Sequence, residues 1–166
     1  MASELHVDSI KHSGGTSAIT IDSSGRVLTP ARPHCFVVFD SAQTGGYTTV
    51  STGSVLPFAS VKVNVGGGTY DTSNYRYTVP ITGMYQVTFN LLLDGVTTFS
   101  CYLRVDGSIV HYWYVADARH MTWTYLHEIS ANSYFDIGHD TGGNRDINRA
   151  GTNATTYTSV SYTLIG

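Results

Sequence analysis

Tyr77-Thr78-Val79-Pro80-Ile81-Thr82-Gly83-Met84-Tyr85-Gln86-Val87-Thr88-Phe89 is the stretch that decides the fold of this chain. Apolar and polar residues alternate over residues 75–79 and again over residues 85–91. Such a period of two is typical of strands with one buried face. Pro80 cannot donate a hydrogen bond to a sheet, and Gly83 tolerates turn conformations. The stretch therefore predicts a strand, a tight turn and a second strand.

The rest of the chain after Pro33 continues in the same manner. No segment shows the periodicity of a helix, and Gly and Asp separate short apolar-polar runs. Asp106-Gly107 is a strong hairpin signal, and Asp94-Gly95 predicts another turn. Many short strands with turns between them favour a β-sandwich or barrel. The expected strands cover residues 35–40, 60–65, 75–80, 84–93, 100–105, 108–114, 121–130, 134–139 and 157–164.

Composition limits the classes of function. The chain has 166 residues and a mass of 18.0 kDa, which suits one domain with a short appendage. Its net charge is −3 and it has no basic stripe, so we expect no nucleic-acid partner. No apolar run has membrane-spanning length, so no membrane partner is expected either. Few charges and 12 tyrosines suit β-structure whose surface is partly covered by other chains.

The N-terminus and the cysteines indicate an intracellular origin. The first residues lack the basic start and apolar core of a signal peptide, so we expect synthesis and assembly in a cytosol. Cys35 and Cys101 fall in predicted strands. Buried free thiols suit that setting, and a disulfide is the alternative.

Residues 1–33 differ in character from residues 34–166. They contain three short β-prone stretches separated by Ser and Gly turns, each with only two or three apolar side chains. Such stretches are too small to fold alone. We therefore predict an attachment or trimerisation segment at residues 1–33 and a main domain at residues 34–166, a disordered leader or an edge hairpin being the alternative. The attachment residues are expected to be Val7, Ile10, Ile19, Ile21 and Val27.

The central stretch resembles the signature of complement C1q-like and tumour-necrosis-factor-like globular heads. The resemblance rests on Tyr70-Asp71, on Tyr77-Thr78-Val79-Pro80 and on residues 83–89, and it extends over residues 33–166. Those heads are jelly rolls that form compact homotrimers. The resemblance implies an all-β, C1q/TNF-like jelly-roll β-sandwich that is homotrimeric, with a short N-terminal β-rich attachment segment.

The first residues resemble the leader of phage tail-fibre and capsid-appendage proteins. The similar residues are Val7-Asp8-Ser9-Ile10, the Gly14-Gly15 turn and residues 18–27. This resemblance implies a bacteriophage virion protein: a tail fibre, spike or capsid decoration, assembled in the host bacterial cytoplasm. The N-terminal segment would bind other virion proteins, and the head would be exposed. The alternatives are a capsid cement or fibre protein that binds no ligand, and a cellular C1q-like lectin.

Aromatic residues next to polar ones suggest where a ligand would bind. Tyr112-Trp113-Tyr114 and residues 121–125 flank a polar segment, and we expect most of these rings in the core or the trimer interface. Exposed rings beside Asp, Asn and Arg are typical of carbohydrate sites. The family topology implies that residues 106–120 and 140–156 lie at the apex, opposite both termini. The predicted contacts to cell-surface polysaccharide are Asp117, Arg119, His120, Asp140, Asn144, Arg145, Asp146 and Arg149.

Catalytic and metal motifs are missing from the sequence. The seven histidines lack zinc spacing, and His127-Glu128 has no second histidine to complete a zincin motif. Residues 136–146 are rich in oxygen and some C1q-like heads hold calcium, but Arg145 opposes a cation and an ordinary polar loop is favoured. No nucleophile elbow, P-loop or dinucleotide fingerprint occurs. We therefore predict no enzymatic activity, no metal and no cofactor.

Overall fold

The computed structural model describes residues 7–15, 17–29, 31–39, 47–140, 142–148 and 158–166. Two compact units divide the chain, Met1–Arg32 and Pro33–Gly166. Every regular element in the described residues is a strand. Among those residues there is no helix that could cross a membrane.

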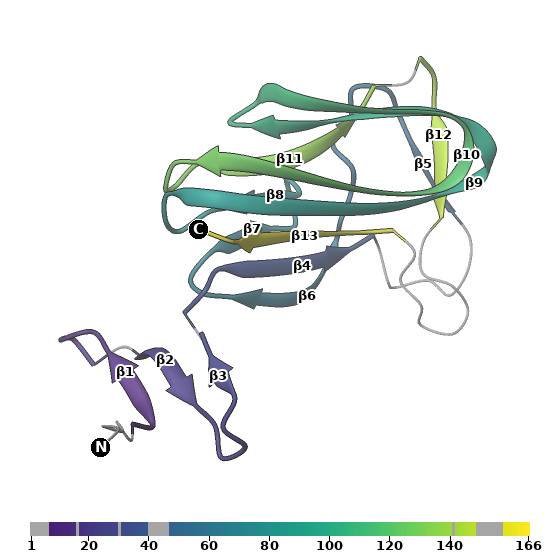
Figure 1. Ribbon diagram of the computed structural model, residues 1–166. Coiled ribbons are helices and arrows are strands. Elements are labelled where there is room, and N and C mark those ends of the chain that lie inside the picture. The colour runs from purple at the N-terminus through teal and green to yellow at the C-terminus, as the bar shows by residue number, and fades with distance from the viewer. Residues whose placement is uncertain (1–6, 16, 30, 40–46, 141, 149–157) are drawn as a thin grey trace. The chain divides into compact units, whose positions relative to one another are not determined.

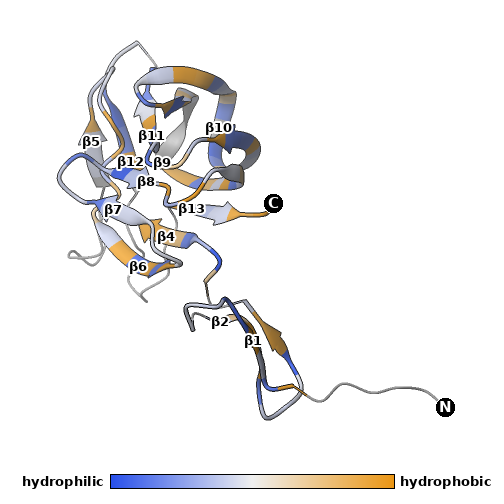
Figure 2. Cartoon of the chain, turned by 90° about the vertical axis from the view of Figure 1, so that its left-hand side faces the viewer, coloured by the Kyte–Doolittle hydropathy of each residue, from blue (hydrophilic) through white to orange (hydrophobic). Residues whose placement is uncertain are grey.

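In the first unit, the part of the chain that the structure describes forms a small three-stranded antiparallel sheet. Its strands β1 (Ser9–Lys11), β2 (Ser17–Ile21) and β3 (Val27–Leu28) follow one another in space as in sequence. The turn between β2 and β3 is held by Asp22, whose carboxylate accepts the backbone N–H groups of Ser24 and Arg26. None of the described residues of this unit is buried, and Figure 2 shows apolar stretches within it.

The described residues of the second unit form ten strands that all pair antiparallel. They are β4 (His34–Val38), β5 (Tyr47–Val50), β6 (Ser60–Val65), β7 (Thr69–Asp71), β8 (Arg76–Thr78), β9 (Gly83–Val105), β10 (Ser108–Ile129), β11 (Tyr134–His139), β12 (Arg145–Asn148) and β13 (Ser159–Leu164).

These strands form two facing layers (Figure 1). The first layer has the order β6, β4, β13, first half of β9, second half of β10. The second layer has the order β7, β8, β11, second half of β9, first half of β10. Strands β5 and β12 pair with each other, and β12 also meets β9 at Leu93.

A single long hairpin contributes to both layers. Strands β9 and β10 pair from Val105–Ser108 at the turn to Gly83–Ile129 at the far end, and both bend between the layers (Figure 1). The turn residues Asp106 and Gly107 have φ angles of 49° and 81°. Positive values at both positions match the two-residue turn that suits the twist of a hairpin.

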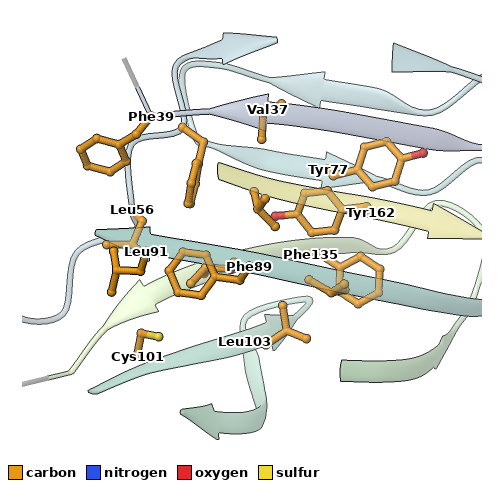
Figure 3. Close-up of a cluster of buried hydrophobic side chains, with 14 of the residues drawn as sticks. Val37, Phe39, Leu56, Tyr77, Phe89, Leu91, Cys101, Leu103, Phe135 and Tyr162 are labelled. Atoms are coloured by element: carbon orange, nitrogen blue, oxygen red, sulfur yellow. The ribbon is translucent and has the colours of Figure 1, made fainter. Parts of the chain in front are cut away.

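Aromatic side chains from both layers fill the core (Figure 3). Phe89 lies at its centre, with ring centroids 5.9 Å from Phe58, 5.7 Å from Trp113 and 5.4 Å from Trp123. Tyr162 stacks between Tyr77 at 5.1 Å and Phe135 at 5.6 Å. Edge-on and offset arrangements of this kind add to the burial of apolar area.

The all-β sandwich predicted from the alternating pattern is confirmed, and several boundaries differ. Residues 94–95 were expected to form a turn but lie within the continuous strand β9, and the expected strands 108–114 and 121–130 form the single strand β10. Strand β8 is shorter than expected because Tyr75 has a φ of 57° and belongs to the preceding turn. Strands β5, β7 and β12 were not predicted.

Both cysteines are buried free thiols, as predicted. Burial raises the pKa of Cys35 to about 12 and raises that of Cys101 well above its ordinary value. Neither thiol is therefore ionised near neutral pH, and both serve as small apolar core residues.

Candidate functional site

The predicted residues Asp117, Arg119 and His120 lie where β10 bends. The register between β9 and β10 shifts on both sides of residue 118, and Asp117 has a φ of 54°. All three side chains are exposed. The Nε of Arg119 donates a hydrogen bond to the carbonyl of Leu93 at 3.3 Å.

The second predicted group lies between the end of β11 and the start of β12. Asp140 and Asn144 are exposed, and Arg145 and Asp146 open β12. Asp146 accepts a 2.6 Å hydrogen bond from the Thr49 hydroxyl of β5. The Nε of Arg145 donates to the carbonyl of Thr98 at 3.1 Å. Arg149 lies outside the described residues.

The two predicted groups meet at one bend of β9. Arg119 contacts the carbonyl of Leu93 and Arg145 contacts that of Thr98, and both carbonyls flank the bend. This end lies opposite Gly166, whose carbonyl accepts a 2.6 Å hydrogen bond from the N–H of Met84. We call the bend the apex and the end with Gly166 the base.

One predicted position was wrong. Residues 106–120 were all expected at the apex, but Asp106 lies at the base. Its N–H donates to the carbonyl of Tyr134 at 3.1 Å, and Tyr134 follows Ser133, which pairs with Val79 next to the base turn. The reason is that β10 runs the full height of the sandwich, so its two ends lie at opposite ends of the unit.

A charged cluster that no sequence motif indicated lies on the outward side of the second layer. Asp136 is fully buried, and its two carboxylate oxygens accept hydrogen bonds from the Nε atoms of Arg76 at 3.2 Å and Arg104 at 2.5 Å. The bond to Asp136 raises the pKa of Arg104. The partners lie 60 and 32 residues from Asp136 in sequence, so only the antiparallel register brings the three together.

Tyrosines surround this cluster on the same side. The guanidinium of Arg76 lies 4.3 Å from the Tyr134 ring centre, and that of Arg104 lies 5.4 Å from the Tyr102 ring centre. Tyr102 makes an edge contact with Tyr112 at 5.8 Å. Tyr112 is 52 % exposed and Tyr114 is 69 % exposed. These two rings were expected in the core or the trimer interface, and the alternation with buried Trp113 turns them out of the core.

The outward side of the first layer has a different composition. Hydroxyl and amide side chains bond across it, with Asn90 accepting from Thr122 at 2.7 Å and Thr88 facing Thr124 at 3.3 Å. Leu126 is 50 % exposed on this side, and Val63 and Val65 are exposed on β6. We call this surface the first-layer face.

His139 is a buried polar residue beneath the apex. Its ring stacks on Phe99 with centroids 4.9 Å apart, and among the described residues neither ring nitrogen has a hydrogen-bond partner. Burial lowers the pKa of His139 below its ordinary value; the Ser51 backbone and Asp140 act in the opposite direction, and Arg145 lowers it further. The described residues hold no group of three His, Cys, Asp or Glu side chains that could bind a metal ion.

Comparison with known proteins identifies the fold. No protein-family model and no curated protein matches the sequence. Eiger TNF from S. frugiperda aligns with a TM-score of 0.61 and 13 % identity over 81 % of this chain and 93 % of that chain. The globular domain of zebrafish complement 1qA aligns with a TM-score of 0.57 and 9 % identity over 80 % and 96 % of the two chains.

Rabbit GITRL gives the same result, with a TM-score of 0.50 and 11 % identity over 80 % of this chain and 94 % of that chain. These similarities confirm the C1q/TNF-like jelly roll that the central stretch predicted. At such low identity these similarities define the class of fold and do not define the function of this chain.

Proposed function

We propose that this chain is a homotrimeric structural protein of a bacteriophage particle: a tail fibre, spike or capsid decoration. The N-terminal unit binds the particle, and the jelly-roll head is exposed. The observation that carries the proposal is the absence of buried residues from the described part of the first unit, where Ile10 is 52 % and Val27 is 66 % exposed. A unit that exposes its few apolar side chains needs partners to cover them.

The first-layer face supports the homotrimer. It combines exposed Leu126, Val63 and Val65 with uncharged Thr and Asn side chains, and Glu128 stands at its base margin. Apolar and uncharged polar groups are typical of the centre of a subunit interface. A trimer would also present three copies of any weak contact, which raises the avidity for a repetitive surface.

The apical groups supply the proposed contacts to host-surface glycan. Asp117, Arg119 and His120 from β10, Asp140 and Asn144 from the segment before β12, and Arg145 at the start of β12 are partly or fully exposed around one bend. Acidic, basic and amide groups together can donate to and accept from sugar hydroxyls. The role is binding and structural, and we assign no catalytic residue.

The molar mass of the purified full-length chain tests the trimer. We expect light scattering after size-exclusion chromatography to give about three times 18.0 kDa. Leu126→Asp should shift the mass toward that of one chain, because it places three charges in the proposed interface. Tyr114→Asp on the opposite layer is the matched control and should keep the trimer mass. A wild-type monomer would overturn the assembly.

Immunogold labelling tests the virion role. Antibody raised against the head should label intact phage particles, and the position of the gold separates capsid from tail. Particles without label would overturn the role. A labelled particle whose adsorption is unchanged by Arg145→Ala would leave a structural protein without an apical glycan site.

A further inference from the structure

The outward side of the second layer forms a second candidate binding surface, distinct from the apical groups. Strands β8, β11, β9 and β10 lie side by side there. We call it the tyrosine–arginine face, made of Arg76, Arg104, Tyr102, Tyr112, Tyr114 and Tyr134. Three strand spacings of about 4.8 Å place β8 about 14 Å from β10, which is the length of a short oligosaccharide rather than of one sugar ring.

Three side chains of this face, Arg76, Arg104 and Tyr102, are held in place before any ligand binds. Asp136, fully buried between them, receives one hydrogen bond from each of Arg76 and Arg104. The Tyr102 ring lies flat over Gly138, where a Cβ atom would collide with it. Fixed side chains lose little conformational entropy on binding, so less of the free energy of their contacts is lost and the affinity is higher.

Positive charge exceeds negative charge at the centre of the face. Two guanidinium groups share one carboxylate, and each contacts it through Nε. Asp71 lies opposite Arg76 in register, but its oxygens accept hydrogen bonds from Ser73 and Asn74 in its own turn. Two further carboxylates lie beside the face: Asp140, near Tyr102 toward the apex, and Asp106 at the base, which accepts a 2.9 Å hydrogen bond from the N–H of Tyr134.

The chemistry of the face matches an acidic sugar. The planar terminal N–H groups of arginine pair with a carboxylate in a two-point geometry. The exposed faces of Tyr112 and Tyr114 offer flat surfaces to the C–H side of a sugar ring, and their hydroxyls can bond to its hydroxyls. A chain of net charge −3 with two arginines here does not present the basic stripe that a nucleic acid requires.

We propose that the tyrosine–arginine face binds a saccharide that bears carboxylate groups. The carboxylate lies against Arg76 and Arg104, and neighbouring sugar rings lie on Tyr112 and Tyr114. The inference rests on the proposed function in one respect, that the head is exposed with the second layer outward. It adds a ligand class and a site that the apical residues do not supply.

Isothermal titration calorimetry of the full-length chain with trigalacturonate tests the proposal. The methyl ester of the same trisaccharide is the matched ligand, because it keeps the rings and removes the charge. We expect wild-type protein to bind the acid and the ester to bind about tenfold more weakly or worse. Arg76→Gln should weaken binding of the acid by a similar factor, and Tyr114→Ala by about threefold to tenfold.

Two controls protect the result. Lys62→Gln removes a positive charge from exposed β6, away from this face, and should bind trigalacturonate as wild type does. Arg76→Gln removes a partner of buried Asp136 and could destabilise the fold, so its thermal unfolding is measured in parallel. The Tyr114 ring is in solvent, so Tyr114→Ala tests the same face without destabilising the fold.

Three results would each overturn the assignment: no binding of trigalacturonate by wild type, equal binding of acid and ester, or unchanged binding by Tyr114→Ala. Dextran sulfate serves as a further probe, and an affinity for it that exceeds that for trigalacturonate would assign the face to general anions. None of these results alters the trimer mass or the labelling of particles, so failure here is distinguishable from failure of the proposed function.

Discussion

The two units of the chain contain the same kind of secondary structure but differ in what supports it. In the first unit the described residues form three antiparallel strands, and its Asp22 turn is closed by contacts two to four residues apart. In the second unit strands far apart in sequence enclose an aromatic core. Because burial of apolar area supplies most of the stabilisation in water, we expect the ladder hydrogen bonds of the first unit to be insufficient without a partner.

The largest effect is expected from the centre of the head. Phe89→Ala removes a fully buried ring that contacts Phe58, Trp113 and Trp123, and should lower the free energy of unfolding by about 3–5 kcal/mol. Urea denaturation measures it. Val27→Ala in the first unit is the control and should stay within about 0.5 kcal/mol. Equal losses in the two variants would contradict the contrast between the units.

The next effect is expected from the buried carboxylate. Asp136→Asn leaves Arg76 and Arg104 without their shared charge and should cost about 1–3 kcal/mol, less than a fully buried pair because both arginines are partly exposed. Asp140→Asn, an exposed carboxylate four residues on, is the matched control. A variant as stable as wild type would contradict a stabilising role for the cluster.

Acid should weaken the head through His139. Its pKa in the folded chain is lowered from the ordinary 6.5, chiefly by burial, so the unfolded chain takes up the proton first as pH falls. The stability present above pH 6.5 is therefore lost as pH decreases from there toward the folded pKa, at about 1.4 kcal/mol for each pKa unit. His139→Phe should keep the stack on Phe99 and flatten the profile between pH 7 and pH 5. An unchanged profile would assign the acid sensitivity to other groups.

The smallest effect on stability is expected in the first unit, together with a large effect on attachment. Val27→Asp should leave the unfolding transition of the head within about 0.5 kcal/mol of wild type. The same change should prevent incorporation of the protein into particles, which immunogold counts can measure. Incorporation at the wild-type level would show that the first unit is not the attachment segment.

Local patterns in the sequence predicted much of the fold. Alternation around Pro80 and Gly83 marked the central strands, and Asp106-Gly107 marked the hairpin turn, because both signals depend only on neighbouring residues. The turn expected at residues 94–95 was wrong because β9 bends there without ending. β9 pairs with β10 at Leu92 and at Thr97, on the two sides of these residues, and with β12 at Leu93, so the strand continues where its local sequence predicts a break.

The candidate surfaces were predicted less completely. Sequence reasoning named Arg119 and Arg145, which the structure places at one bend, because polar residues beside aromatic ones are visible in the sequence. It did not find Arg76, Arg104 and Asp136, since their association depends on the register of three strands. It also could not decide which of Tyr112, Trp113 and Tyr114 point outward, because that depends on the register of β10 against β9.

The continuous β9–β10 hairpin has a consequence for the order of folding. Pairing of β9 with β10 can extend outward from Asp106-Gly107, so each new pair closes only a short additional length of chain. Formation of this one hairpin supplies strands to both layers. We expect this hairpin to be formed in the folding transition state, ahead of the distant pairing of β4 with β13. Gly107→Ala should then slow refolding in stopped-flow experiments more than it accelerates unfolding, because its φ of 81° suits glycine. If Gly107→Ala accelerates unfolding more than it slows refolding, the turn forms after the transition state. A jelly roll built in this way has a local starting point within an architecture dominated by long-range contacts.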